Sequence, residues 1–186
     1  MSRHNWYEMG PFTVFDLETT GMSAVNDRIV ELAALRIDLD GTTQQYQSLI
    51  NPGCYISHRV IAIHNITNEM VADAPKFSQV AYEFLEFAAG TTLVAHNGKF
   101  DLSFLQESLY RSGLPLWDGK VLDTLRLSKS VFNNLPSYSL QNLRRSLGLP
   151  DTAEMMQAHR AMSDVLWTVE LLRVLLEEVL RHNSGR

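Results

Sequence analysis

Three acidic motifs, far apart in the chain, limit what this sequence can fold into. The first contains Asp16 and Glu18, the second Asp101 and the third Asp164. Because residues i and i+2 of a strand project to one face, Asp16 and Glu18 would point together from the end of the apolar run 12–15. If the other two carboxylates join them, four like charges crowd one cleft and repel each other strongly. We therefore expect two divalent cations to neutralise them.

The donor atoms of these motifs favour Mg²⁺ or Mn²⁺. Carboxylate oxygens are hard ligands, and carboxylates together with substrate phosphate are the usual environment of Mg²⁺, so zinc is the less favoured metal. Two such ions, typically about 3.5 to 4 Å apart, can activate a water and stabilise the attacking and departing oxygens at phosphorus. The motifs therefore indicate hydrolysis of a phosphodiester bond.

His159, five residues before Asp164, is the motif residue suited to take a proton from that water. Its unperturbed pKa of about 6.5 allows it to act as a general base near neutral pH. Five residues of α-helix separate two side chains by roughly 140° around the axis. We therefore expect His159 at or before the first turn of the helix that carries Asp164.

The order of the expected elements favours an α/β domain with a mixed sheet covered by helices. An antiparallel meander is predicted first, followed by two more strands that alternate with helices. Residues 51–75 are predicted to be loop-rich, with a short helix capped by Thr67. The predicted strands are 12–16, 28–39, 43–50, 91–95 and 120–123, and the predicted helices are 78–89, 101–111, 125–131, 140–147 and 159–180.

A chain of 186 residues suits one domain, which we predict at 11–182, between a polar leader at 1–10 and a short tail at 183–186. No apolar run approaches the roughly 20 residues that cross a bilayer, and the leader lacks the apolar core of a secretory signal. The default expectation is a cytoplasmic protein without a membrane partner. Cys54 is the only cysteine, which excludes an intrachain disulfide and a thiolate zinc cluster.

The net charge of −5 argues against a broad basic surface that grips long nucleic acid. It does not exclude nucleic acid as a substrate. Neutralising the four proposed ligands would bring the net charge close to zero, so a phosphodiester could approach a short, locally positive site.

The three motifs resemble those of the DEDDh family of 3′-5′ exonucleases, the group that contains the proofreading epsilon subunit of bacterial DNA polymerase III. A tyrosine-type member would carry tyrosine four residues before the last aspartate, where Arg160 stands, so the histidine subtype is indicated. The matching residues, in motif order, are Asp16-x-Glu18 with Thr19-Thr20-Gly21, then Asn97-x-x-Phe100-Asp101 with Phe104-Leu105, then His159 with Asp164.

This resemblance implies a ribonuclease H-like fold with a mixed five-stranded sheet whose first three strands are antiparallel. It implies that the metal ligands are Asp16, Glu18, Asp101 and Asp164, and that His159 is the base. It also implies a set of residues that bind the terminal nucleotide, namely Thr19, Thr20, Gly21, Met22, His64, Asn97 and Phe100.

Met22 follows Gly21 where relatives often carry an apolar wedge against the last bases. His64 has two roles open to it, packing within its loop and contact with substrate. Next to it, relatives usually have glycine where this chain has Asn65, and asparagine tolerates left-handed backbone better than most residues.

We therefore expect a metal-dependent 3′-5′ exonuclease that acts on single-stranded DNA and releases nucleoside 5′-monophosphates, in proofreading or repair. One alternative is the same chemistry on short or structured RNA, which equal DNA and RNA oligonucleotides would separate. Another is a polymerase-associated nucleic-acid-binding module. A contact with a polymerase or with a second copy of the chain stays open.

Overall fold

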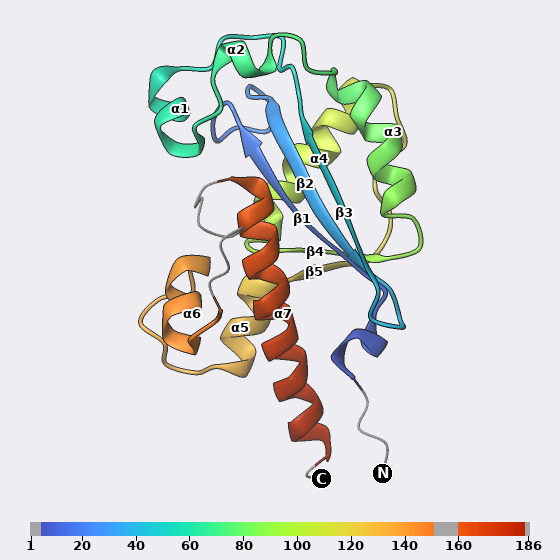
Figure 1. Ribbon diagram of the computed structural model, residues 1–186, viewed down its shortest axis with the longest axis vertical. Coiled ribbons are helices and arrows are strands. Elements are labelled where there is room, and N and C mark those ends of the chain that lie inside the picture. The colour runs from blue at the N-terminus through green and yellow to red at the C-terminus, as the bar shows by residue number, and fades with distance from the viewer. Residues whose placement is uncertain (1–4, 151–159, 185–186) are drawn as a thin grey trace.

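The computed structural model describes residues 5–150 and 160–184, and its centre is a five-stranded sheet in the order β3-β2-β1-β4-β5 (Figure 1). The first three strands form an antiparallel meander, and the last two are parallel to β1. The predicted mixed sheet is therefore confirmed. Its strands are β1 (Phe12–Thr19), β2 (Ile29–Ile37), β3 (Thr43–Leu49), β4 (Thr92–Ala95) and β5 (Val121–Asp123).

Strand β1 is longer than the predicted strand 12–16, and its extra residues matter for the site. Its pairing with β2 continues to Thr19, with an irregularity between Glu18 and Thr19. Its parallel pairing with β4 covers only residues 12–14. The last residues of β1 therefore have one edge free of β4, and the N-terminus of α4 (Gly98–Arg111) occupies that position: the backbone N–H of Leu17 donates to Oδ1 of Asp101 at 3.2 Å.

Helices cover both faces of the sheet, and alternate residues of β1 pack against different helices. Phe15 and Leu17 belong to a core that includes residues of α3 (Phe77–Phe87) and α4. Val14 belongs to a second core, on the face covered by α7 (Ala161–Ser184). The helices α5 (Thr124–Val131) and α6 (Leu140–Leu147) lie against α7 (Figure 1).

The segment predicted to be loop-rich contains a helix that the sequence did not predict, α1 (His58–His64). Seven residues are too few to show a clear helical period, and the apolar residues that fix the segment, Ile56 and Ile66, lie outside the helix and pack with Val30 of β2. The predicted helix after Thr67 is α2 (Asn68–Val71), and Oγ1 of Thr67 accepts a hydrogen bond from the N–H of Met70 at 3.3 Å.

Part of the predicted polar leader is ordered against the domain. A short 3₁₀-helix, η1 (Trp6–Met9), places Trp6 and Tyr7 against the core beneath α7. The proposed boundaries of the domain stay a prediction. Within the described part of the chain, no helix combines the length and the apolar character that crossing a membrane requires.

Candidate metal centre

The carboxylates of Asp16, Glu18 and Asp164 converge: one oxygen of each lies within 4.8 Å of the oxygens of the other two. Asp16 and Glu18 lie on one face of β1, as their spacing predicted, and Asp164 comes from the first turn of α7, which packs on that face. All three side chains are partly buried. Three oxygens at this spacing could hold a metal ion.

Asp101 approaches the same place from the first turn of α4 and is buried. It does not belong to the group of three converging oxygens, and one of its own oxygens accepts the hydrogen bond from the Leu17 backbone. Its charge nevertheless reaches the group, because it is the largest electrostatic contribution to the raised pKa of Asp16 after burial. The predicted fourth carboxylate thus lies beside the other three.

Burial and mutual repulsion raise the pKa of these carboxyl groups. Burial, and then the charges of Asp164, Glu31 and Asp101, raise the pKa of Glu18 to about 8. Burial raises the pKa of Asp101 to about 7, and the pKa of Asp16 lies well above its usual range, first because Asp16 is buried. Without a cation these groups retain protons near neutral pH, and a divalent cation would replace the protons. The donor set therefore fits Mg²⁺ or Mn²⁺.

A further buried carboxylate, Glu31 of β2, holds the start of α7 in place. Arg160 donates to it from Nη2 to Oε1 at 2.8 Å and from Nε to Oε2 at 3.2 Å. The backbone N–H of Ala161 donates to Oε2 at 3.2 Å, and Nε2 of Gln47 donates to Oε1 at 2.9 Å. Because Asp164 lies one turn after Arg160, these contacts also position Asp164.

The sequence motifs missed this role of Glu31. It is a single charged residue inside the buried run of β2, whose other residues are almost all apolar and buried. A glutamate at a position that the pattern assigns to the core is rarely buried without a partner. That conflict was the signal that could have identified it.

The loop after β1 contains the predicted nucleotide-binding residues Thr19, Thr20, Gly21 and Met22. Thr19 donates from Oγ1 to the carbonyl of Gly21 at 2.6 Å, and Oγ1 of Thr20 accepts the N–H of Arg28 at 3.0 Å. A Cβ on Gly21 would lie 2.5 Å from the Asp27 carboxylate, so another residue there would require the Asp27 side chain to move. Met22 is 82% exposed, and its predicted contact with the last bases stays a prediction.

His64 and Asn65 end α1. His64 is buried, and its Nδ1 accepts the N–H of Ile66 at 3.0 Å, while its Nε2 has no hydrogen-bond partner among the described residues. Burial lowers the pKa of this imidazole. Asn65 has φ 60° and ψ 18°, the left-handed conformation that glycine adopts most easily. Asparagine therefore forms the turn without changing its geometry.

The second motif begins with Asn97, which is also left-handed, with φ 62°, and exposed. Its backbone N–H donates to Oδ1 of Asp123 at 3.1 Å, which ties the end of β4 to the end of β5. Phe100 is partly buried, and its ring lies 4.9 Å from that of Phe104. These two predicted nucleotide-binding residues thus lie beside Asp101. His159, the predicted base, lies outside the described residues, and its role stays a prediction.

Comparison with known proteins gives matches over most of the chain. An exonuclease family model, RNase_T, matches residues 13–172. The epsilon subunit of DNA polymerase III from Treponema pallidum is 36% identical over 180 residues, which cover 96% of this chain and 82% of that protein. The PolC-type DNA polymerase III of Caldanaerobacter subterraneus is 37% identical over 170 residues, but the chain spans only 12% of its length.

Solved structures share the fold. Exonuclease X in complex with 5′-overhanging duplex DNA is 28% identical, with a TM-score of 0.69, and the match covers 89% of this chain and 91% of that one. Exonuclease I of E. coli in complex with a dT13 oligonucleotide is 19% identical, with a TM-score of 0.79 over 94% of this chain and 42% of that one. The ribonuclease H-like fold expected from the sequence is confirmed.

Proposed function

The chain belongs to the RNase_T exonuclease family, and from this we propose that it removes nucleotides from the 3′ end of single-stranded DNA and releases nucleoside 5′-monophosphates. Family membership makes the protein a nuclease. The direction of digestion, the DNA substrate and the roles of individual residues are the proposal.

The observation that carries the proposal is the convergence of Asp16, Glu18 and Asp164 within 4.8 Å, with buried Asp101 beside them. We assign these four carboxylates as ligands of two Mg²⁺ or Mn²⁺ ions. Such ions supply activation of a water and stabilisation of negative charge at phosphorus. The raised pKa values support the assignment, because the cluster needs positive charge in order to ionise fully.

The remaining residues would bind the substrate and move the proton. The loop containing Thr19, Thr20 and Gly21 is held closed by its own hydrogen bonds and can present backbone groups to the terminal nucleotide. Met22 would pack against the last bases, and His64 and Asn97 would border the sugar. Phe100, whose ring packs against that of Phe104, would contribute its aromatic side chain to the same binding site. His159, just before the anchored Arg160, would accept the proton of the attacking water.

The proposed substrate and partner draw support from two relatives. Exonuclease X, at 28% identity, was solved with 5′-overhanging duplex DNA, and the Treponema pallidum relative is a subunit of DNA polymerase III. We therefore favour DNA over RNA and propose proofreading or repair, with a polymerase as partner. Such a role would place the protein in the cytoplasm, where bacterial DNA is replicated.

The test is digestion of a 5′-labelled single strand with Mg²⁺ or Mn²⁺. We expect products that shorten stepwise from the 3′ end, together with nucleoside 5′-monophosphates identified by chromatography. Asp16→Asn should abolish turnover while the far-UV circular dichroism stays unchanged. Digestion of an RNA strand of the same sequence shows whether the enzyme prefers deoxyribose or ribose. Strands that stay intact with both metals, or that shorten from the 5′ end, would overturn the proposal.

A further inference from the structure

A hollow of about 820 Å³ lies between the first turn of α4, the end of β5 and the start of α5. The lining has two kinds of residue. Lys99 and Arg126 are exposed cations, and Leu102, Leu122 and Leu127 are partly buried apolar residues. None of these five residues has a role in the metal centre described above.

The hollow borders the helical turn that carries Asp101. Asn97 and Lys99 line the hollow, and the first turn of α4, which begins after Asn97 and includes Lys99, also carries Asp101. Asp123, another lining residue, accepts the backbone N–H of Asn97 at 3.1 Å, which holds the end of β5 against the start of the helix that carries Asp101. A ligand that occupies the hollow therefore lies next to the metal centre.

The two cations are available to a ligand. In residues 5–150 and 160–184, neither Lys99 nor Arg126 forms an ion pair or a side-chain hydrogen bond. The acid in the hollow, Asp123, accepts the backbone N–H groups of Asn97 at 3.1 Å and Leu125 at 2.9 Å through Oδ1. These two N–H groups partly offset the negative charge of Asp123. Lys99 and Arg126 therefore remain available to bind an anion.

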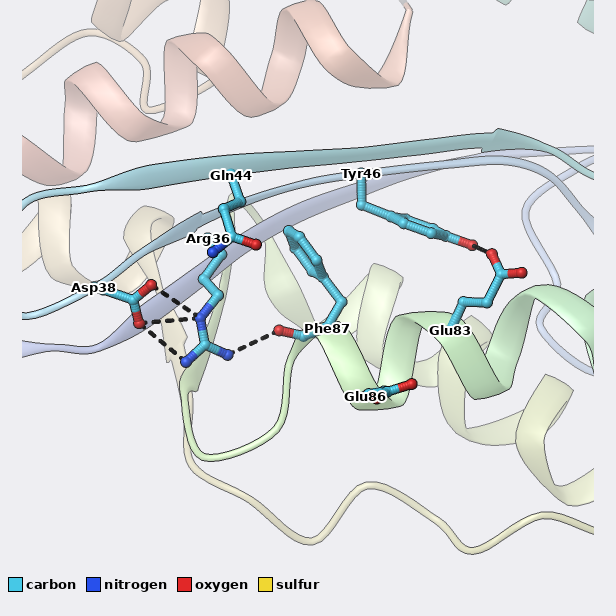
Figure 2. Close-up of a pocket in the computed structure, with 7 residues that line it drawn as sticks. All are labelled: Arg36, Asp38, Gln44, Tyr46, Glu83, Glu86 and Phe87. Atoms are coloured by element: carbon cyan, nitrogen blue, oxygen red, sulfur yellow. Dashed lines mark hydrogen bonds and ion pairs between the residues drawn. The ribbon is translucent and has the colours of Figure 1, made fainter.

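A second hollow, of about 460 Å³, differs from the first because its cation is already paired (Figure 2). Its one cation, Arg36, is held by Asp38 at 3.0 Å and by the carbonyl of Phe87 at 2.9 Å. The hydroxyl of Tyr46 donates to Glu83 at 3.0 Å. With its one cation already paired and three acids in its lining, this hollow does not suit a phosphate.

The order of the strands suggests what the first hollow would bind. The segment around α1, which includes His64, packs with Val30 of β2 through Ile66, on one side of β1, whereas the hollow lies at β5, on the other side. Asp16 and Glu18 of β1 lie between the two. A strand with its last nucleotide beside His64 and its scissile phosphate at β1 would continue into the hollow.

We propose that this hollow binds the nucleotide on the 5′ side of the scissile bond, with its phosphate between Lys99 and Arg126 and its base on Leu102, Leu122 and Leu127. This inference rests on the proposed nuclease function and adds a specific subsite to it. Cationic side chains bind nucleic-acid phosphates without regard to sequence, and apolar side chains accept any base. The subsite would therefore favour substrates longer than one nucleotide.

The test compares two substrates that differ only in the leaving group. One is a short oligothymidylate, and the other is the 4-nitrophenyl ester of thymidine 5′-monophosphate, in which nitrophenol replaces the upstream nucleotide. For Lys99→Ala/Arg126→Ala we expect kcat/KM on the oligothymidylate to fall about tenfold, mainly through KM, and to change less than about twofold on the ester. The salt dependence of the oligothymidylate KM should weaken by about one in log–log slope.

The matched control is Lys120→Ala/Arg145→Ala, which removes the same charge from exposed positions outside the hollow. Equal losses on both substrates, no loss on the oligothymidylate, or an equal loss in the control would overturn the subsite. If the wild-type protein cleaves neither substrate, the proposed function fails instead. Anisotropy with a labelled phosphorothioate oligothymidylate then still decides the subsite, because unchanged affinity in the Lys99→Ala/Arg126→Ala variant would refute it.

Discussion

Arg160 contacts Glu31 through two nitrogens, the shorter contact being 2.8 Å, although the two residues are 129 positions apart in the chain. The Glu31 side chain has no exposed surface, whereas that of Arg160 is 23% exposed. The pair joins the middle of the sheet to the start of α7, one turn before Asp164. The position of Asp164 in the metal centre therefore depends on a contact between two residues that are not themselves proposed ligands.

Replacing Arg160 with alanine should destabilise the protein by about 3 kcal/mol, because it leaves the buried carboxylate of Glu31 without its charged partner. Urea unfolding measures this loss. Arg173→Ala is the control, since Arg173 pairs with Glu170 at 3.0 Å and Glu177 at 3.1 Å on the partly exposed surface of α7. That change should cost only about 0.5 kcal/mol. Similar small losses in both variants would contradict the role assigned to Glu31.

The metal-free protein should lose stability as the pH rises from about 5 to about 8. The pKa of Glu18 is raised from 4.5 to about 8 on folding, so in this window the folded state binds more protons than the unfolded state. The stability from this group is complete below the unfolded pKa and is lost as the pH rises through the folded pKa. Asp101, with a pKa of about 7, acts in the same direction.

Urea unfolding in EDTA across this range measures the slope. Glutamine at position 18 does not titrate. The unfolding free energy of Glu18→Gln should therefore fall less steeply with pH than that of the wild type. A wild-type stability that increases with pH, or a Glu18→Gln slope equal to the wild-type slope, would count against the buried acidic cluster.

Mn²⁺ should raise the melting temperature more at pH 8 than at pH 5, because protons and the cation compete for the same carboxylates. Scanning fluorimetry at several Mn²⁺ concentrations measures the shift. Asp16→Asn/Asp164→Asn, which removes two of the three converging carboxylates, should abolish most of it. An equal shift at both pH values, or a shift that survives in this variant, would place the cation elsewhere.

Asn65→Gly should leave stability nearly unchanged, whereas Asn65→Ala should cost about 1 kcal/mol. Position 65 has φ 60°, where a Cβ without a local hydrogen-bonding group is strained and glycine is not. Thermal unfolding of the two variants measures the difference, and each serves as the control for the other. An alanine variant as stable as the glycine variant would show that this backbone conformation is not fixed by the fold.

Much of the fold was predictable because it depends on local pattern. The strand alternation around Tyr46 and the helical apolar spacing around Phe84 identify their elements to within a residue or two. The pattern failed at α1, which is short and held by Ile56 and Ile66 on either side of it. The pattern also predicted that β1 ends at residue 16, whereas the strand continues to Thr19. The polar residues at its end do not show the apolar alternation that is typical of a strand.

The candidate site was predictable to a similar extent. The i, i+2 spacing places Asp16 and Glu18 on one face, and the third motif supplies Asp164, so these residues could be named from the sequence. The second motif likewise supplies Asp101, which lies beside them, whereas the pairing of Glu31 with Arg160 depends on contacts between residues far apart in the chain. Such contacts leave no local pattern, and only the folded structure reveals them.

The most direct test of the metal centre is anomalous diffraction from crystals grown with saturating Mn²⁺ and thymidine 5′-monophosphate. The account predicts manganese peaks within coordination distance of the carboxylates of Asp16, Glu18 and Asp164, with one of the ions reaching Asp101. Manganese found only at other surface carboxylates, with none at these residues, would contradict it.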